Sequence, residues 1–342
     1  MKKIILFGGS FDPIHNGHLQ AALEAYKNIN ADHLYFIMSF ISPDNKNHKS
    51  TWEQRKKMIN IAIKNYSFFS VSEIEKENEE ISYTYKNVNY FKNKFPESEL
   101  YLLVGSDQFN NFKNWKNYDQ IEKECKIICF ERENNFINKE EKIILIKEPK
   151  VNTSSSELIL NPDIKMMNQD VLNYINENSI YGIYRLEKEG LSERRISHCI
   201  EVANISKQIA SAHSEDFQIK AYCAGLYHDI AKEIPIDKQI HYSKALLNYN
   251  DYPSWKVIHG PLGEYIMKRK YLFKDEDILN AVKFHTIPRS NPTLLEKIVF
   301  CADKISSRKH RKTNYELIDL CISNLEEGYK TIFKINMESI KE

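Results

Sequence analysis

The chain has 342 residues, and its 48 basic and 47 acidic side chains leave a formal net charge of +1. That length predicts two domains of roughly 150 to 190 residues each. The balanced charge provides no overall field that would attract nucleic acid or an anionic membrane, so neither is an expected partner, and any phosphate site must be local.

The six cysteines lack the paired C-x-x-C spacing of a zinc knuckle or a disulfide framework, and we expect them to be small buried side chains in a reducing cytosol. The apolar run 4–7 is shorter than the apolar region of a signal peptide, and no apolar run of about 18 residues occurs. These features predict a soluble cytoplasmic protein and leave the oligomeric state open, a homodimer included.

Short β-rich runs alternate with helical patterns through the first half of the chain. This alternation predicts a parallel sheet covered by helices on both faces, with ligands bound beyond the carboxyl ends of the strands. The predicted strands are 4–9, 33–40, 68–75, 98–107, 125–132 and 142–148, and the clearest helical patterns are 18–29 and 53–65.

The segment GGSFDPIHNGHL (residues 8–19) follows the first predicted strand. A strand, a glycine-rich turn and a helix beginning near His18 form an arrangement in which backbone N–H groups and a helix N-terminus receive phosphate. His15 and His18 would project from this corner and donate hydrogen bonds to phosphoryl oxygens as negative charge shifts in a transition state. The chemistry needs neither imidazole as a nucleophile.

This segment resembles the signature of the HxGH nucleotidyltransferases, most closely that of bacterial nicotinate-nucleotide adenylyltransferases. Further motifs of that family follow in order, up to about residue 184. The matching positions are Pro43 and Lys46 in a proline-rich lysine loop, Arg55 and Met58 in an R-x-x-M helix, Ser82, Tyr83 and Thr84 where the nicotinate carboxylate is read, Gly105, Ser106 and Asp107 in the nucleotide pocket, Trp115 where a ring stacks on the pyridine, and Arg132 beside the mononucleotide.

The resemblance implies in-line attack by the phosphate of nicotinate mononucleotide on the α-phosphorus of ATP, giving nicotinate adenine dinucleotide and pyrophosphate. Positioning and charge stabilisation catalyse such displacements, usually with Mg²⁺ on the triphosphate. His15, His18 and Lys46 would be the catalytic residues. ATP and the mononucleotide would be bound by Gly8, Gly9, Ser10, Phe11, Thr84, Gly105, Asp107, Trp115, Arg132, Ser154 and Ser155.

One position departs from the family pattern. The family follows a serine/threonine segment with an arginine that grips ATP phosphates, whereas TSSSELILNP places Ile159 there. The serines 154–156 stay at a predicted helix N-terminus and can still receive phosphate. Losing one charge-assisted contact removes roughly 1.5–3 kcal/mol of binding, about ten- to a hundredfold. We therefore expect weaker ATP binding unless Lys165 or another cation substitutes.

The second half changes to long apolar stripes of period 3.6, which predict an all-helical domain. Gly190 suits a helix end, and Ser192 suits the N-cap of the next helix. The expected domain limits are therefore 1–186 and 187–342. The predicted helices lie within 192–213, 216–234, 260–270, 275–286 and 294–307.

Imidazole and carboxylate side chains recur on, or at the ends of, these apolar stripes. A lone histidine in such a place is usually a satisfied core residue, but a whole set of such groups would be costly to bury unpaired, so a shared metal explains them better. These ligand types suit iron, manganese or zinc, and an Asp beside a His can bridge two ions. The candidate ligands are His198, His228, Asp229, His259, His285 and Asp303.

The order H…HD…H…H…D resembles the HD phosphohydrolase superfamily. Its surroundings R-x-x-H, YHDIAK, HGPLG, FHT and CAD resemble the HD-domain family that hydrolyses diadenosine tetraphosphate symmetrically to two ADP. The resemblance implies two divalent ions, iron first with manganese or zinc as alternatives, and a bridging water of lowered pKa as the nucleophile. One ion would be held by His198, His228, Asp229 and Asp303, the other by Asp229, His259 and His285.

Two basic positions complete this interpretation. Lys232 would act as a catalytic residue that holds a phosphate oxygen, with an exposed helical lysine as the alternative. After Asp303 the family tends to continue with an acidic residue, a proline and an arginine, whereas this chain reads KISSRKHRK. Arg308 is the candidate replacement for binding polyphosphate, with Lys309 as the alternative, and the basic run 304–312 is either a polyphosphate-facing patch or a solvated loop.

Together the resemblances predict a Rossmann-like α/β nucleotidyltransferase domain with a parallel sheet, followed by an all-α HD domain. The leading hypothesis is a bifunctional enzyme that joins an adenylyltransferase of NAD biosynthesis to a dinucleoside-tetraphosphate hydrolase. One alternative keeps both folds but changes the substrates, for example to nicotinamide mononucleotide or phosphopantetheine in the first domain and another nucleotide in the second. Another makes one half a non-catalytic nucleotide sensor, which the Ile159 departure leaves open. A nucleic-acid-binding module is disfavoured by the near-neutral charge.

Overall fold

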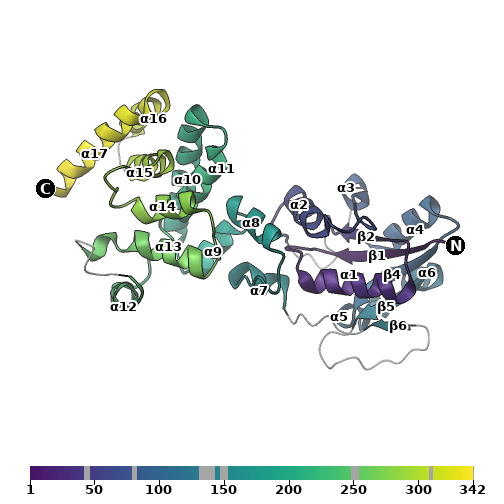
Figure 1. The fold of residues 1–342 in the computed structure, drawn as a ribbon. Coiled ribbons are helices and arrows are strands. Elements are labelled where there is room, and N and C mark those ends of the chain that lie inside the picture. Colours follow the sequence, from purple (N-terminus) through teal and green to yellow (C-terminus); the bar gives the residue numbers. More distant parts are fainter. Residues whose placement is uncertain are drawn as a thin grey trace. The chain divides into compact units, whose positions relative to one another are not determined.

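The computed structural model describes residues 1–41, 47–78, 83–130, 143–146, 153–247, 254–307 and 311–341. These residues form two compact units, Met1–Leu172 and Asn173–Glu342, whose elements are labelled in Figure 1. Each unit has a hydrophobic core of its own. The functional residues of each half of the sequence are therefore positioned by separate sets of elements.

The first unit is built on a six-stranded sheet in which every neighbouring pair of strands is parallel. The strand order β3-β2-β1-β4-β5-β6 reverses direction between β1 and β4, and such a reversal opens a ligand-binding crevice at the carboxyl ends of those strands. The predicted parallel α/β fold is confirmed. The strands are β1 (Lys3–Gly9), β2 (His33–Met38), β3 (Phe69–Ser72), β4 (Glu99–Gly105), β5 (Cys125–Phe130) and β6 (Ile143–Ile146).

Helices cover both faces of this sheet. Because side chains alternate along a strand, β1 turns Leu6 into a core shared with Phe91 of α4 and turns Phe7 to the opposite face, where its ring centroid lies 6.2 Å from that of His18 in α1. The helices are α1 (Asn16–Ile29), α2 (Trp52–Ile63), α3 (Ile74–Asn78), α4 (Thr84–Lys94), α5 (Ser106–Phe109), η1 (Phe112–Asn114), α6 (Tyr118–Glu124), α7 (Ser155–Leu160) and α8 (Gln169–Glu177).

Among the element limits that differ from those expected from the sequence, two have clear local causes. Helix α1 begins at Asn16 rather than near His18, because the imidazole of His15 serves as its N-cap. The predicted strand 68–75 is shorter, because pairing with β2 stops at Ser72 and the chain then enters α3. Both differences reflect side-chain and inter-strand contacts that periodicity alone does not encode.

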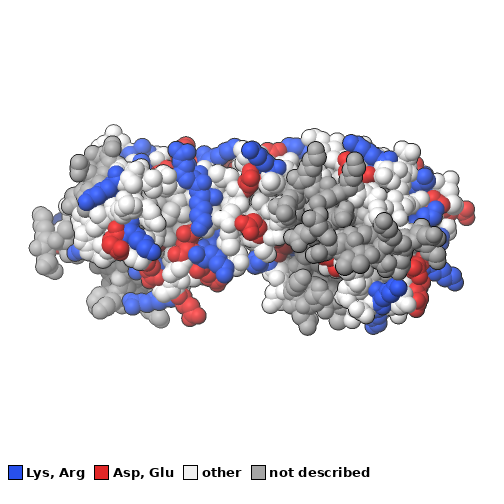
Figure 2. Space-filling view, turned by 90° about the horizontal axis from the view of Figure 1, so that it is seen from below, with Lys and Arg blue, Asp and Glu red and all other residues white. Residues whose placement is uncertain are grey.

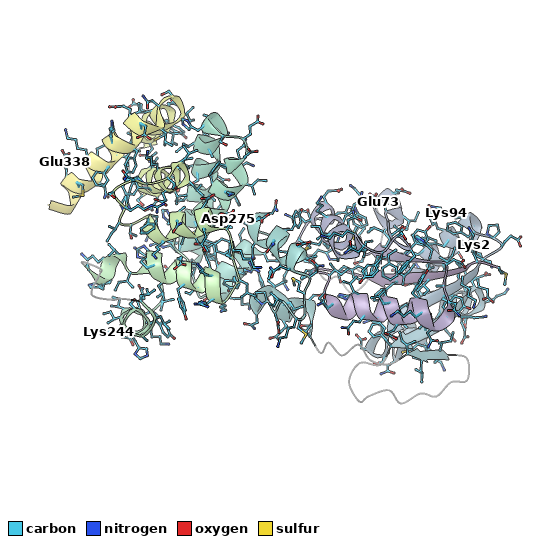
Figure 3. All side chains as sticks on the ribbon, viewed as in Figure 1. Lys2, Glu73, Lys94, Lys244, Asp275 and Glu338 are labelled. Carbon is cyan, nitrogen blue, oxygen red and sulfur yellow. The ribbon has the colours of Figure 1, made fainter. Side chains whose placement is uncertain are left out.

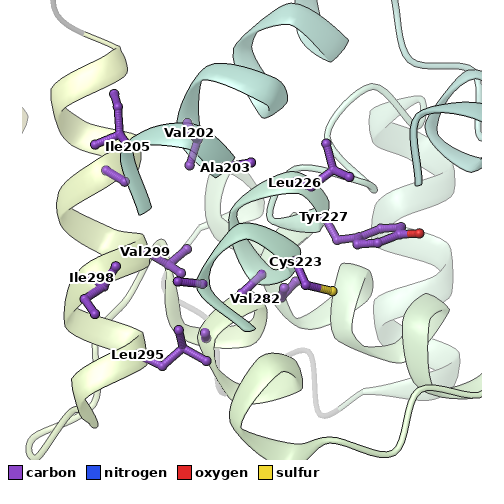
Figure 4. Packing of buried hydrophobic residues seen from close by; sticks show 14 of the residues in the cluster. Val202, Ala203, Ile205, Cys223, Leu226, Tyr227, Val282, Leu295, Ile298 and Val299 are labelled. Atoms are coloured by element: carbon purple, nitrogen blue, oxygen red, sulfur yellow. The ribbon is translucent and has the colours of Figure 1, made fainter. Parts of the chain in front are cut away.

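The second unit is helical throughout its described part, as predicted. Val202 of α10, Tyr227 of α11, Val282 of α14 and Val299 of α15 belong to its central core, which Figure 4 shows from close by. The helices are α9 (Gly182–Lys188), α10 (Glu193–His213), α11 (Phe217–Tyr227), α12 (Ile236–Leu246), η3 (Trp255–Val257), α13 (His259–Arg269), α14 (Glu276–Phe284), α15 (Leu294–Ser306), α16 (Arg311–Ser323) and α17 (Leu325–Lys341).

Side-chain caps fix the starts of several of these helices. Ser192 caps α10 by accepting the backbone N–H of Arg195, and Gly190, two residues earlier, has a positive φ of 86°. The predicted helix end at Gly190 and the predicted N-cap at Ser192 are therefore confirmed. Asp275, labelled in Figure 3, caps α14 by accepting the N–H groups of Asp277 and Ile278. The N-terminal ends of these two helices are thus fixed by local contacts.

The segment before residue 187 packs with the helical unit. Arg185 is buried, donates from Nη1 to Asn176 Oδ1 at 2.9 Å and lies 4.6 Å from the ring centroid of Tyr271. The Asn176 amide in turn donates to the Tyr271 carbonyl at 2.9 Å. The packing units therefore divide at 172/173, against the 186/187 expected for the two family domains.

The cysteines and the surface agree with the composition. All six cysteines are buried free thiols, as predicted. On the face shown in Figure 2, basic and acidic side chains are interspersed among uncharged ones. In the part of the chain that the structure describes, no helix combines the length and apolar character needed to cross a membrane.

Candidate functional site

The end of β1, the turn after it and the start of α1 (residues 8–18) form a corner at the carboxyl edge of the sheet, here called the phosphate corner. Strands β1 and β4 are parallel neighbours, so Gly9 and Gly105 end at the same edge, and Asp107 follows, exposed, in α5. A Cβ on Gly8 would meet no atom within 4 Å, which leaves its backbone open to a ligand, whereas a Cβ on Gly9 would lie 2.9 Å from the buried Phe11 ring.

His15 and His18 cap α1 through their Nδ1 atoms. His15 Nδ1 accepts the backbone N–H of Gly17 at 3.1 Å, and His18 Nδ1 accepts that of His15 at 3.3 Å. A neutral imidazole whose Nδ1 accepts carries its proton on Nε2. With ring centroids 3.8 Å apart, the two side chains bring paired Nε2–H donors to a positive helix N-terminus. This arrangement suits the stabilisation of phosphoryl oxygens.

Two polar side chains hold the phosphate corner in shape. Arg55 of α2 is only 2% exposed and donates from Nη1 to the carbonyl oxygens of Ser10 at 3.0 Å and Ser39 at 2.9 Å. Asp12 accepts the hydroxyl of Ser50 at 2.5 Å. Arg55 therefore ties the turn after β1 to the end of β2, which gives the predicted R-x-x-M helix a structural task at this site.

The serine segment predicted to receive phosphate adjoins the same corner. Ser154 caps α7 by accepting the N–H of Glu157 at 3.1 Å, and the Ser155 hydroxyl donates to the Pro13 carbonyl at 2.9 Å. The N-terminus of α7 is thus tied directly to the loop that precedes His15. Both hydroxyls have these structural partners in addition to the phosphate role predicted for them.

A core residue fills the position where the family has its phosphate-gripping arginine. Ile159 in α7 is 1% exposed, so its side chain faces the core of the first unit and not a ligand. The backbone of Lys165 lies next to the phosphate corner. Its carbonyl accepts the Asn16 side-chain amide at 2.9 Å, and the N–H of Asn16 donates to the Met166 carbonyl at 2.8 Å. The exposed Lys165 is therefore on the segment that touches the first residue of α1.

The segments predicted to bind the pyridine ring lie beside each other. Lys116 Nζ is 4.5 Å from the ring centroid of Tyr83, which brings the start of α4 to the end of η1. Thr84 is the first residue of α4. Trp115 is half-buried against Phe112, with ring centroids 5.4 Å apart, so one part of its indole packs on the core. The candidate positions outside the described residues are Pro43, Lys46, Ser82, Arg132, Arg308 and Lys309.

One carboxylate divides the predicted metal ligands of the second unit into two sets. Asp229, in the turn after α11, has its Oδ2 3.5 Å from His228 Nε2 and 4.0 Å from His198 Nε2. Asp303 of α15 completes this set, with its Oδ1 3.4 Å from His198 Nε2 and 3.6 Å from His228 Nε2. The other Asp229 oxygen, Oδ1, lies 3.2 Å from His259 Nε2.

His285 completes the second set. Its Nε2 is 3.6 Å from Asp229 Oδ1 and 3.2 Å from His259 Nε2. Burial lowers the pKa of His259 to about 4 and lowers that of His285, so neutral imidazoles are favoured at both positions. An aspartate with one oxygen in each set has the geometry of a ligand that bridges two cations.

Backbone carbonyls turn two of the Nε2 atoms inward. His228 Nδ1 donates to the Gly225 carbonyl and His285 Nδ1 donates to the Val282 carbonyl, both at 2.7 Å. A neutral imidazole that donates from Nδ1 keeps its lone pair on Nε2, which is the tautomer that binds metals. The orientation of these two ligands is therefore set by their own helical turns.

Two side chains in series, here called the relay, orient the His198 ring in the same way. The Ser306 hydroxyl donates to Glu201 Oε2 at 2.8 Å, so its oxygen accepts His198 Nδ1–H at 3.2 Å. This outer contact, like the carbonyls behind the other histidines, orients the ring. It joins α10 to α15 across a sequence separation of 108 residues.

The donor set fits divalent cations. Among the described residues His228 Nε2 is buried without a hydrogen-bond partner, although it points between two carboxylates. Burial works to raise the pKa values of Asp229 and Asp303, but the charges of His228 beside Asp229 and of Lys304 beside Asp303 outweigh it and hold both well below their usual values. The two carboxylates in turn raise the pKa of His228 against its burial, so a bound cation would take the place of a proton on its Nε2. Ionised carboxylates and imidazole lone pairs facing one point form a ligand set for metals such as iron, manganese or zinc.

A pocket of about 240 Å³ opens beside these ligands, and Asp229, His259 and Asp303 form part of its wall. Its basic side chains are Arg195, Lys232, Lys256 and Lys304. Positive charge next to a metal-ligand set suits an anionic polyphosphate.

Three of these cations already contact the ligand set. Arg195 Nη1 donates to Asp229 Oδ2 at 2.7 Å, and Lys304 Nζ donates to Asp303 Oδ2 at 2.7 Å. Lys232 Nζ lies 3.2 Å from a nitrogen of His259, and burial lowers its pKa. The predicted phosphate-holding residue Lys232 therefore lies at the second ligand set and lines the pocket.

Site roles for Arg195 and for the Ser306–Glu201 pair were not predicted from the sequence, and Lys304 was considered only as part of the basic run 304–312. The signal that identifies Arg195 and Ser306 is helical spacing: Arg195 precedes His198 by three residues, and Ser306 follows Asp303 by three, so each shares a helix face with a ligand. Glu201, three residues after His198, follows the same rule.

Comparisons with known proteins match the two halves of the chain to two different families. The cytidylyltransferase-like family matches residues 6–162, and the HD domain family matches residues 195–308. The "probable nicotinate-nucleotide adenylyltransferase/Ap4A hydrolase" of Mycoplasma genitalium is 35% identical over 351 aligned residues, which cover 100% of this chain and 99% of that protein. The protein of the same name from Mycoplasma pneumoniae is 30% identical over 345 residues, with 98% of each chain covered.

A shorter relative matches the first part alone. The "probable nicotinate-nucleotide adenylyltransferase" of Staphylococcus epidermidis is 34% identical over 187 residues, which cover 53% of this chain and 98% of that protein. The two Mycoplasma proteins, in contrast, match from end to end with both domains present. The chain therefore belongs to the family of nicotinate-nucleotide adenylyltransferase/Ap4A hydrolase proteins, which join a cytidylyltransferase-like domain to an HD domain.

Proposed function

We propose that this chain is a bifunctional enzyme with small nucleotides as its substrates. Its first domain, 1–186, transfers AMP from ATP to nicotinate mononucleotide, and its second, 187–342, hydrolyses diadenosine tetraphosphate symmetrically to two ADP. The names of the full-length relatives support this pair of activities. The observation that carries it is the opposite hydrogen bonding of the two histidine groups, which makes donors at the phosphate corner and metal ligands in the helical unit.

In the first reaction, the phosphate of nicotinate mononucleotide attacks the α-phosphorus of ATP and pyrophosphate leaves on the opposite side. Nε2–H groups of His15 and His18 donate to the phosphoryl oxygens as their negative charge shifts toward the leaving group. The open backbone at Gly8 receives phosphate oxygens, the positive end of the α1 dipole attracts them, and Lys46 and Lys165 supply countercharge. Magnesium bound to ATP supplies further charge neutralisation.

In the second reaction, water adds to one of the two central phosphorus atoms, the central P–O bond breaks, and ADP leaves. His198, His228, Asp229 and Asp303 would hold one divalent ion and Asp229, His259 and His285 a second. Such ions supply Lewis acidity to a water molecule and a phosphoryl group. Arg195 and Lys232 line the pocket and bind phosphate oxygens, which orients the central bond toward the ligand set.

A two-part assay tests these activities. Purified protein is incubated with ATP plus nicotinate mononucleotide or nicotinamide mononucleotide, and separately with diadenosine tetraphosphate plus Fe²⁺, Mn²⁺ or Mg²⁺, and the products are separated by chromatography. We expect nicotinate adenine dinucleotide from the first reaction and ADP alone from the second, with loss of hydrolysis in a chelator. Preference for the nicotinamide substrate contradicts the first assignment, and AMP plus ATP as products contradicts the second.

A further inference from the structure

One basic side chain of the pocket beside the metal ligands makes no described contact with the ligand set. Arg195, Lys304 and Lys232 each contact a member of the ligand set. Lys256 also lines the pocket, but its Nζ has no hydrogen bond or ion pair to any described residue. It is therefore the pocket cation whose charge is available to a part of the substrate that lies away from the metal ligands.

Lys256 stands on a turn that is fixed to both sides of the metal centre. Its N–H donates to the Ser254 hydroxyl at 3.2 Å, which caps η3, and this turn leads directly into His259. The carbonyl of the next residue, Val257, accepts the hydroxyl of Thr286 at 3.2 Å. Because Thr286 follows His285, the backbone of Lys256 is anchored between two ligands of one set, although its side chain is exposed.

The dimensions of the pocket indicate which part of the substrate it holds. At about 240 Å³ it is smaller than the roughly 300–1,000 Å³ of pockets that enclose a whole small ligand. A polyphosphate chain fits this space better than a chain with two nucleosides attached. When the bond to be cleaved lies at the metal ligands, the phosphates of the leaving half must extend through the rest of the pocket, which Lys256 lines.

We propose that Lys256 is a specificity-determining residue that binds the phosphates of the leaving half, so that the site favours longer polyphosphate chains over shorter ones. This inference rests on the proposed hydrolase function. Lysine binds phosphate as a point charge, and an exposed contact of this kind contributes mainly to affinity. Lys256 accordingly affects binding and not the chemical step.

The test compares the native full-length enzyme with Lys256→Gln in the presence of Mn²⁺. Inorganic tripolyphosphate and pyrophosphate are used as competitive inhibitors of diadenosine tetraphosphate hydrolysis. We expect the Lys256→Gln change to weaken tripolyphosphate inhibition and to raise the substrate KM by roughly three- to tenfold, with kcat and pyrophosphate inhibition unchanged. Lys256→Arg should restore the native values, since it returns the charge.

A matched control keeps the outcome specific. Lys268→Gln removes an equally exposed lysine on α13 that pairs with Glu276 at 2.7 Å, and it should change none of these constants. The proposal is overturned if Lys256→Gln weakens inhibition by tripolyphosphate and by pyrophosphate equally, or if it weakens neither. Calorimetric titration of tripolyphosphate into the Mn²⁺-loaded proteins needs no turnover, so it tests Lys256 even where hydrolysis is absent and thereby separates failure of this inference from failure of the hydrolase assignment.

Discussion

The histidines of the two units differ in one hydrogen bond each, and that bond decides what they can do. At the phosphate corner, Nδ1 of His15 and of His18 accepts a backbone N–H, so each neutral ring presents a donor at Nε2. In the helical unit, Nδ1 of His228 and of His285 donates to a backbone carbonyl, so each ring in its neutral form presents a lone pair at Nε2. The same residue type therefore offers an N–H donor at a helix start and a lone pair that suits a metal at a helix end.

The two sites also differ in how they are built. The phosphate corner depends on exposed backbone at Gly8 and on the positive end of the α1 dipole, whereas the candidate metal centre depends on side chains such as His228 and Asp229 that are almost fully buried. Backbone sites tolerate change in neighbouring side chains, while buried ionisable groups must all be satisfied together. Substitutions should therefore affect the two activities separately and to different degrees.

The largest expected effect comes from the shared carboxylate of the metal centre. Asp229→Ala removes a ligand from both sets, and we expect hydrolysis to fall by at least about a thousandfold because several kcal/mol of charge stabilisation are lost. Adenylyl transfer should not change. Metal content by mass spectrometry and both activities check this, with Asp277→Ala on the exposed face of α14 as the control. Near-native hydrolysis by a metal-poor variant would contradict the assignment.

The donor role of the phosphate corner is tested by His18→Asn. The asparagine oxygen can still accept the His15 N–H and keep the cap, but its side chain does not reach as far as Nε2. We expect kcat of adenylyl transfer to fall by about 10²–10³ with hydrolysis and stability unchanged. His33→Ala, which removes a histidine bonded to Ser70 at the start of β2, is the control. If His18→Asn lowers metal content instead, the contrast between the two histidine groups is wrong.

The tautomer of His198 is tested through its relay. Ser306→Ala removes the acceptor of His198 Nδ1–H, and loss of such an outer contact typically weakens metal binding by about 10–100-fold. Competition with a chelator of known affinity measures the change, and Ser306→Thr should restore binding because it keeps the hydroxyl. Unchanged metal affinity in Ser306→Ala would show that the relay does not set the tautomer.

The smallest expected effect concerns Lys165, the cation proposed to replace the family arginine. Lys165→Ala should raise the KM for ATP by roughly three- to tenfold, since a single exposed charge–phosphate contact is lost. The KM for diadenosine tetraphosphate should stay the same. Initial rates over a range of ATP concentrations give the answer, with Lys188→Ala as the control. An unchanged KM for ATP would show that Lys165 does not substitute for the missing arginine.

Sequence patterns predicted the features that depend on local order. The alternation of apolar runs gave the parallel sheet, and the aspartate beside His228 indicated the ligand that stands between two sets. The patterns did not predict contacts made across the fold, such as His198 with Ser306, separated by 108 residues. Nor did they show that Ile159 faces the core, because a six-residue helix is too short for its buried face to be read from periodicity.

The start of α1 makes His15 responsible for two properties at once. Its imidazole is the N-cap of the helix and also a proposed catalytic donor. Serine or aspartate caps a helix better, and a good cap contributes about 0.5–2 kcal/mol to stability. His15→Ser or His15→Asp would therefore keep the cap while removing the Nε2–H donor, and the loss of the buried ring offsets part of the gain from a better cap. On the proposed catalytic role, folding and turnover can therefore be separated at this position, because a variant that keeps the cap should fold and yet transfer adenylyl groups poorly.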